Sequence, residues 1–283
     1  MPSKADLHIH TSFSDGRLSP QDAVEIANEK KLSALSITDH DTYKGYFEAK
    51  KVADELEIEL IPGVEITSTL GDKEAHILAY YFETDTSYLE DFLKSQRNAR
   101  KSRIKGIIKK VQKAGVNVEY DEVWAEANGA NIGRPHLARV LTQKGYVSSP
   151  KEAFIRYLSN QKLGSIENTY PDYREVIRIV KNVGGACIVA HPGRMYSSEE
   201  MKLFIEAGID GIECIHPSHN YKLQKKYTEL CSENGLLMTG GSDTHEGKDA
   251  GYMNLGVVTI AYKHIEKMKK MTHQRKNIVE IKK

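Results

Sequence analysis

The chain has 283 residues, which is enough for one large domain or for one domain that carries a sizeable insertion. Its 40 Lys and Arg residues nearly balance its 39 Asp and Glu residues, which argues against a protein that coats nucleic acid or membranes nonspecifically. No apolar run approaches the roughly 20 residues that a membrane-spanning helix needs, so we expect a soluble cytoplasmic protein whose three cysteines are buried and reduced.

The first 83 residues predict strands that alternate with helices. Strands are expected at about 5–9, 32–38, 59–66 and 75–82, and the last two should be joined by a turn at Gly71-Asp72. A helix should begin at Pro20, and a second should run from an N-cap at Asp41 to about Leu56. Polar residues of an unusual kind stand near the strand ends, namely His8, His10, Asp15, His40, Glu65 and His76.

Residues 84–170 differ in sequence pattern from the first 83 residues, because they predict helices and no strands. Nine Lys or Arg residues and no acidic residue lie between Phe92 and Lys113, which predicts a basic helix that attracts an anion. Further along, Pro135 suits a first helical turn and places Arg134 and His136 at a helix N-terminus, where phosphates bind. We interpret 84–170 as a helical lid inserted between two parts of one domain, 1–83 and 171–283.

The alternation of helices and strands resumes after residue 171. Helices are expected at about 172–182, 197–208, 220–234 and from Lys263, with strands at 186–190, 211–214, 236–239 and 256–260. Further polar residues follow these strands, namely His191, Arg194, His216, His219, Asp243 and His245. Strand C-termini of parallel barrels open onto the face where loops reach a ligand, so we expect function there.

Nine of these groups at successive strand ends are hard to explain by packing. A buried set of this kind must be paired or bound to metal, because unpaired polar groups are costly in a core. Nitrogen and oxygen ligands without thiolate suit Mn, Zn or Fe at two or more positions. The predicted ligands are His8, His10, Asp15, His40, Glu65, His76, His191, Asp243 and His245.

At this point the chain resembles the polymerase and histidinol phosphatase (PHP) superfamily. The resemblance rests on four motifs in order, His8-x-His10, Thr38-Asp39-His40, Ala190-His191-Pro192 and Ser242-Asp243-x-His245. It implies an α/β fold, a distorted (β/α)7 TIM-like barrel, with a trinuclear metal centre of two or three divalent ions. It also implies three ligand groups, one of His8, His10, Glu65 and Asp243, a second of Glu65, His76 and His191, and a third of Asp15, His40 and His245.

The resemblance implies a hydrolase of phosphate esters. Two neighbouring cations lower the pKa of a shared water, which gives a bridging hydroxide that attacks phosphorus. We place Asp39, His191, Asp243 and His245 in the catalytic group, with Asp39 expected to orient an imidazole rather than to donate a proton. The substrate phosphates are expected to meet Arg134, His136, His216, His219 and Arg194.

Our first hypothesis is removal of the 3′-phosphate from a nucleoside 3′,5′-bisphosphate, or attack on a short 5′-phosphorylated RNA. This branch is suggested by resemblance of the insertion around Arg134 and of the element Ile215 to His219. One alternative is a histidinol-phosphate phosphatase, whose cationic substrate would suit a basic lid poorly. Another is a non-catalytic module that binds metal or nucleic acid. No protein partner is predicted.

Overall fold

Two sheets form the centre of the molecule. The computed structural model describes residues 3–163, 169–248 and 254–281, and within these residues nine strands are found. The first sheet has the order β3 (Glu59–Leu60), β2 (Ala34–Ile37), β1 (Lys4–Ile9) and β9 (Ile260–Ala261). The second has the order β4 (Gly63–Leu70), β5 (Lys73–Tyr80), β6 (Ala186–Val189), β7 (Gly211–Ile215) and β8 (Leu237–Gly240).

The two sheets meet at strand ends that carry the polar residues of interest. Isolated parallel bridges join Ile9 to Thr244 and His40 to Glu65, so the end of each sheet touches the other at this edge. The described strands nevertheless form two sheets and not one closed barrel. The α/β class is therefore confirmed, whereas strand pairing does not establish the expected (β/α)7 barrel.

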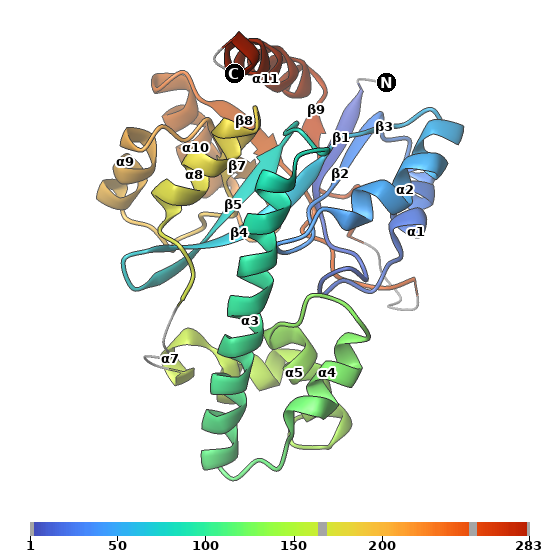
Figure 1. Ribbon diagram of the computed structural model, residues 1–283, viewed down its shortest axis with the longest axis vertical. Coiled ribbons are helices and arrows are strands. Elements are labelled where there is room, and N and C mark those ends of the chain that lie inside the picture. Colours follow the sequence, from blue (N-terminus) through green and yellow to red (C-terminus); the bar gives the residue numbers. More distant parts are fainter. Residues whose placement is uncertain (1–2, 164–168, 249–253, 282–283) are drawn as a thin grey trace.

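Helices cover the outer faces of both sheets (Figure 1). Helices α1 (Pro20–Glu29) and α2 (Lys44–Glu55) pack on the first sheet. Helices α8 (Tyr173–Asn182), α9 (Ser198–Glu206) and α10 (Tyr221–Glu233) cover the second, and α11 (Lys263–Ile281) lies against its other side. Ser19 and Ser197 accept backbone hydrogen bonds as N-caps of α1 and α9, as their sequence patterns indicate.

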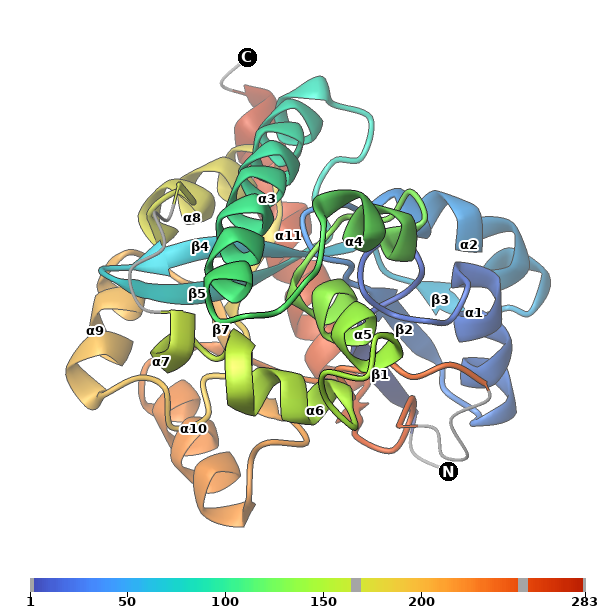
Figure 2. The same cartoon turned by 90° about the horizontal axis from the view of Figure 1, so that it is seen from below.

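The helical insert, residues 84–170, has a hydrophobic cluster of its own. It contains α3 (Ser87–Lys113), α4 (Tyr120–Ala127), α5 (Arg134–Gln143), α6 (Pro150–Ala153), a π-helical turn (Phe154–Leu158) and α7 (Asn160–Leu163). Ile104, Ile108, Leu137 and Leu141 form part of this cluster. Figure 1 shows that α3 starts beside the sheets and extends to the other insert helices below them. In Figure 2, which is seen from below, these helices lie in front of the sheets.

Three local predictions are wrong. The strand expected at 59–66 is divided between β3 and β4, which belong to different sheets, so Glu65 lies near the start of β4. Asp41 does not cap α2, because its carboxylate accepts hydrogen bonds from Thr67 and Arg100, and Tyr43 occupies the N-cap position instead. The last strand is also displaced from 256–260 to Ile260–Ala261, since the preceding residues form a turn. No helix in the described ranges is both long and apolar enough to cross a membrane.

Candidate metal centre

The two histidines of β1 lie on one side of the strand. Alternation along β1 directs His8 and His10 away from the packed side chains of Leu7 and Ile9. Both imidazoles are fully buried, and their Nε2 atoms are 3.1 Å apart. Two imidazole nitrogens that meet in a buried site need a proton or a cation between them.

Glu65 on β4 is the carboxylate at the centre of the cluster. Its two oxygens face five imidazoles, at distances of 2.8 Å to His191, 2.9 Å to His76, 3.1 Å to His40, 3.2 Å to His10 and 3.6 Å to His8. The side chain is 1% exposed. Because these residues lie in β1, β4 and β5 or shortly after β1, β2 and β6, the convergence depends on how the two sheets meet.

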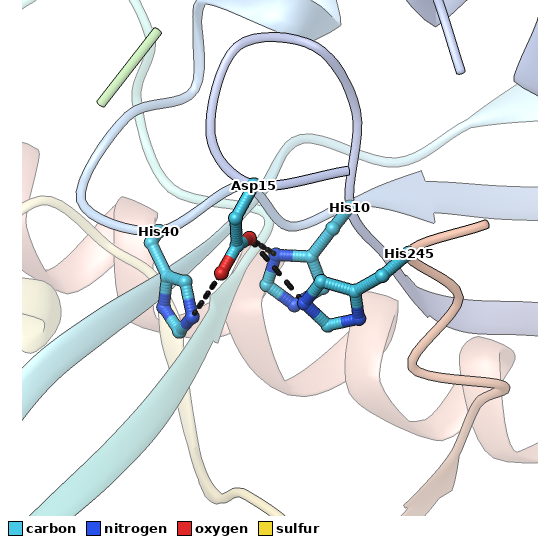
Figure 3. A group of neighbouring side chains, drawn as sticks. All are labelled: His10, Asp15, His40 and His245. Carbon is cyan, nitrogen blue, oxygen red and sulfur yellow. Dashed lines mark ion pairs between the residues drawn. The ribbon is translucent and has the colours of Figure 1, made fainter. Parts of the chain in front are cut away.

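Asp15 forms a second focus in the loop after β1 (Figure 3). Its Oδ1 atom lies 3.3 Å from His10 Nδ1 and 3.3 Å from His245 Nε2, and its Oδ2 atom lies 3.6 Å from His40 Nε2. The rings of His10 and His245 stack with their centroids 4.1 Å apart. His10 thus stands between the Asp15 group and the Glu65 group.

Asp243, just after β8, completes the set. Its Oδ1 atom lies 3.3 Å from the Nε2 atoms of both His8 and His10, and its Oδ2 atom lies 3.2 Å from His216 Nε2. Asp243 and His191 have φ angles of 50° and 26°, which non-glycine residues rarely adopt. Such strain is typical of functional sites, where the surrounding structure holds a side chain in place.

The charges of the cluster stabilise one another. Burial alone would raise the pKa of Glu65, but the imidazoles of His40, His76 and His8 hold it well below its usual range. Burial opposes protonation of His8, yet the carboxylates of Glu213, Asp243 and Glu65 raise its pKa. Ionised carboxylates among imidazoles form a strongly cation-attracting site.

The donor atoms fit divalent metal ions. The Nδ1 atoms of His40 and His76 are buried, face Glu65 from 3.1 and 2.9 Å, and make no hydrogen bond of proper geometry. Ligands of one ion at bond lengths of about 2.0–2.2 Å stand roughly 3 Å apart when they meet at a right angle. The structure thus brings all nine predicted ligands into one cluster with the spacing that metal coordination produces.

Glu213 on β7 belongs to the same cluster and was missed by the sequence analysis. Its Oε1 atom lies 3.0 Å from His8 Nδ1, and its Oε2 atom accepts a hydrogen bond of 2.7 Å from the backbone N–H of His191. A carboxylate that bonds the far nitrogen of an imidazole fixes the ring and its tautomer. The signal was present in the sequence as one acidic residue in an otherwise apolar strand.

Asp39 acts through its neighbours. Its Oδ1 atom accepts hydrogen bonds from the Thr11 N–H at 2.7 Å and from Ser14 Oγ at 2.6 Å, and Thr11 Oγ1 donates to Oδ2. Ser14 Oγ in turn lies 3.3 Å from His10 Nδ1 and 3.2 Å from Asp15 Oδ1. Asp39 is fully buried, so this geometry favours the expected orienting role over proton donation.

A cavity of about 90 Å³ lies between the insert and the cluster. It is lined by the ligand candidates Asp15, His40 and His76 and by polar groups around them, namely Glu74, Arg100, Arg103, Arg134 and Tyr170. Glu74 binds Arg103 at 2.8 Å and Arg134 at 3.2 Å, and it also lies 3.2 Å from His76 Nε2. The predicted Arg134 therefore reaches the edge of the cluster, together with two arginines that were not singled out.

The cations of α3 are less free than the sequence suggested. Arg97 pairs with Glu90, Arg100 pairs with Asp41 at 2.6 Å, and Arg103 pairs with Glu74. The absence of acids within the segment is thus offset by acids elsewhere, so the expectation of an uncompensated basic helix is wrong for these three arginines.

The other predicted substrate residues separate into two kinds. Arg194 and His216 line a second cavity of about 540 Å³, which also reaches His191 and Asp243. His219 instead uses both ring nitrogens within the protein, where Nε2 accepts from the Gly193 N–H and Nδ1 donates to the Cys214 carbonyl.

His136 also has an internal role. Its Nδ1 atom accepts a hydrogen bond of 3.1 Å from the Gly133 N–H at the start of α5, and the side chain is 1% exposed. Burial lowers the pKa of His136 to about 4, so the imidazole is neutral at pH 7. Neither His136 nor His219 lines the described cavities.

Comparison with known proteins agrees with this geometry. The model of the PHP domain family matches residues 6–210. A 5′-3′ exoribonuclease of Haemophilus influenzae is 34% identical over 261 residues, which cover 90% of this chain and 94% of that protein. A 3′,5′-nucleoside bisphosphate phosphatase of Chromobacterium violaceum is 30% identical over 258 residues, with 87% and 90% of the two chains covered.

A solved structure shares the whole architecture. The protein from Bifidobacterium adolescentis, described as a metal-dependent phosphoesterase, superimposes with a TM-score of 0.86 and 30% sequence identity. The similarity covers 96% of this chain and 98% of that one. With the strand-end cluster, the family match and these relatives in agreement, the chain belongs to the PHP domain family.

Proposed function

We propose that this chain is a metal-dependent phosphoesterase that acts on nucleotides. The observation that carries the proposal is the convergence of nine imidazole and carboxylate side chains into one cluster of overlapping groups, whose members are buried or partly buried. We assign them to three ions, with Glu65 shared between two of them. The first ion would be held by His8, His10, Glu65 and Asp243, the second by Glu65, His76 and His191, and the third by Asp15, His40 and His245.

Divalent ions such as Mn, Zn or Fe would supply Lewis acidity and a water of lowered pKa at this site. The protein contributes orientation. Glu213 fixes the ring of His8 and the backbone of His191, and Asp39 fixes the loop that carries Asp15. These contacts hold the cluster in place before substrate arrives, so little reorganisation is needed during reaction.

The proposed substrate is a nucleoside 3′,5′-bisphosphate, from which the 3′-phosphate is removed. Arg100, Arg103 and Arg134 line the smaller cavity, and guanidinium groups bind phosphate oxygens in a planar, two-point manner. The cavity volume of about 90 Å³ suits a phosphate group better than a nucleoside. The phosphatase of Chromobacterium violaceum, whose name gives this substrate, supports the choice.

A second candidate substrate is a short 5′-phosphorylated RNA. The cavity of about 540 Å³ opens beside His191 and Asp243, and Arg194, Ser218 and Asn220 supply polar groups to it. Its volume falls in the range that holds a drug-sized ligand and is large enough for a further nucleotide. The exoribonuclease of Haemophilus influenzae supports this alternative.

The architecture fits this role as an opened form of the family's (β/α)7 barrel. In this interpretation, the bridges Ile9 to Thr244 and His40 to Glu65 mark the seams between the two sheets. Residues 84–170 act as a lid that shapes the smaller cavity. The three buried free cysteines suit a reducing compartment such as the cytoplasm.

The experiment is a comparison of three substrates with Mn²⁺ and with a chelated control. We expect inorganic phosphate to be released from adenosine 3′,5′-bisphosphate faster than from histidinol phosphate, and nucleotides to be released from a 5′-phosphorylated RNA of a few residues. Preference for histidinol phosphate would contradict the nucleotide assignment. No turnover of any of the three would leave the non-catalytic module as the function.

A further inference from the structure

Two loops that carry cluster residues are held by the helical insert as well as by the sheets. Asp15 lies in the loop between β1 and α1, and His40 lies in the loop between β2 and α2. By contrast, Glu65 and His76 lie within the β4–β5 ladder, where Glu65 pairs with Leu78 and His76 pairs with Thr67. Loop residues need support from other parts of the molecule if their positions are to be fixed.

Asn131, between α4 and α5, makes the most direct of these contacts. Its Nδ2 atom donates a hydrogen bond of 2.6 Å to the carbonyl of His40, and its backbone N–H donates one of 3.0 Å to the carbonyl of Phe13. The side chain is 6% exposed. One insert residue thus bonds both loops, at Phe13, which lies two residues before Asp15, and at His40 itself.

Neighbouring contacts of the insert converge on the same two loops. Arg139 Nη1 donates to the Asp15 carbonyl at 3.3 Å, and Arg97 Nη1 donates to the Asp41 carbonyl at 3.0 Å. Arg100 pairs with the Asp41 carboxylate, and Asp41 has a left-handed φ of 52°. Three insert side chains therefore bond the backbone carbonyls of Asp15, His40 and Asp41, and a fourth, that of Arg100, bonds the Asp41 carboxylate.

We propose that the insert is part of the metal centre, and that Asn131 is a positioning residue for the ion assigned to Asp15, His40 and His245. The inference rests on the proposed function, because it requires that the cluster bind metal. Without the Nδ2 bond of Asn131, the loop that carries His40 loses a side-chain contact with the insert, whereas the backbone bond to Phe13 remains, and this ion should bind more weakly. The other two ions depend on residues in or directly after the sheet strands and should be retained.

Gln96 provides a matched control. Gln96 also lies in the insert and also bonds a backbone carbonyl, because its Nε2 atom donates a hydrogen bond of 3.0 Å to the Thr67 carbonyl. Gln96 is 2% exposed. Thr67 lies in the β4–β5 ladder. Asn131 and Gln96 are therefore two buried amides of the insert, of which one reaches a ligand loop and the other a strand.

The experiment measures metal per chain in the full-length protein after saturation with Mn²⁺ and dialysis. Asn131→Asp keeps the shape of the side chain but removes the N–H donor to the His40 carbonyl, and Asn131→Ala removes the amide group altogether. In the control, Gln96→Ala removes the hydrogen bond to the Thr67 carbonyl. Thermal unfolding of each variant shows whether the fold persists. For both Asn131 variants we expect two ions instead of three, with affinity for the lost ion reduced about 10–100-fold, and for Gln96→Ala three ions.

Each outcome has a separate meaning. Three tightly held ions in both Asn131 variants, or equal losses in the Asn131 and Gln96 variants, would overturn the positioning role. A wild-type protein with only two ions would overturn it as well, because the ion in question would then be absent. A wild-type protein without any bound Mn²⁺ would instead contradict the proposed function itself.

Discussion

The strand-end cluster and the helical insert hold their charged side chains in different ways. In the cluster, β1, β4 and β5 present His8, His10, Glu65 and His76 directly, so backbone ladders set their positions. In the insert, arginines reach across to acids of the α/β body, such as the pair of Arg100 with Asp41. Geometry thus comes from the sheets in one region and from long side chains in the other.

This difference indicates that the cluster and the insert arginines have different roles. A metal cluster tolerates little displacement, and sheet edges position side chains precisely. Phosphate recognition needs cations that can exchange one anionic partner for another, and Arg103 and Arg134 already share the carboxylate of Glu74. Substitutions in the cluster should therefore affect turnover, whereas substitutions of the insert arginines that line the smaller cavity should affect substrate binding.

The largest effect is expected for Glu65→Gln. The change removes the carboxylate charge that faces five imidazoles, so at least one proposed ion should be lost and turnover should fall by about 10³-fold or more. Steady-state kinetics together with metal analysis provide the measurement. Turnover within a few-fold of wild type would show that the cluster is not the reaction centre.

A smaller loss of turnover is expected for Glu213→Gln. This residue bonds the far nitrogen of His8 and the backbone of His191, so the cluster should remain but lose part of its orientation. Substitutions of such supporting groups typically cost 10–100-fold in metal affinity or activity. The prediction is checked by kcat at saturating Mn²⁺, and an unchanged kcat would contradict the orienting role.

Arg134→Gln tests the insert side of the comparison. We expect KM for adenosine 3′,5′-bisphosphate to rise by roughly 10-fold, with kcat less affected, because a charged hydrogen bond contributes about 1.5–3 kcal/mol. Arg156→Gln is the control, since Arg156 is exposed, pairs with Glu152 and lies outside the described cavities. Equal effects of the two substitutions would mean that Arg134 has no specific place in substrate binding.

The smallest effect concerns stability and pH. His136 must stay neutral to accept the Gly133 N–H, and burial lowers its pKa from the ordinary 6.5 to about 4. Its contribution is therefore complete above about pH 6.5 and is lost as the pH falls toward 4, with about 1–2 kcal/mol lost by pH 5.

Urea unfolding of the wild type and of His136→Asn at pH 7.5 and pH 5 isolates this contribution. The variant should lose less stability between the two pH values, because asparagine has no proton to gain. Other groups titrate in both proteins and cancel in the difference. An identical loss in both would show that His136 does not carry this pH dependence.

Much of the cluster could be predicted from the sequence, since strand alternation and strand ends are local features. His8-x-His10 alone is a weak signal, but the residues after later strands extend it to nine positions. Glu213 escaped because the imidazole that it bonds, His8, lies 205 residues away in the sequence. The β4–β5 hairpin was predicted from its turn, but the division into two sheets was not, because the antiparallel pairing of β5 with β6 depends on contacts distant in sequence.

The insert was predicted less well, for a physical reason. Its helices and hydrophobic periodicity are local, but the partners of Arg100 and Arg103 lie elsewhere in the chain, at Asp41 and Glu74. A count of charges within a segment cannot show such pairs. His136 likewise has a capping role that depends on its burial, which no local pattern indicates.

The most direct test of the central claim is elemental analysis of the purified wild-type protein, with activity measured before and after removal of metal. The account predicts two or three equivalents of Mn, Zn or Fe per chain, loss of phosphate release on chelation, and recovery when Mn²⁺ is restored. Full activity in a protein that contains no bound metal would contradict it.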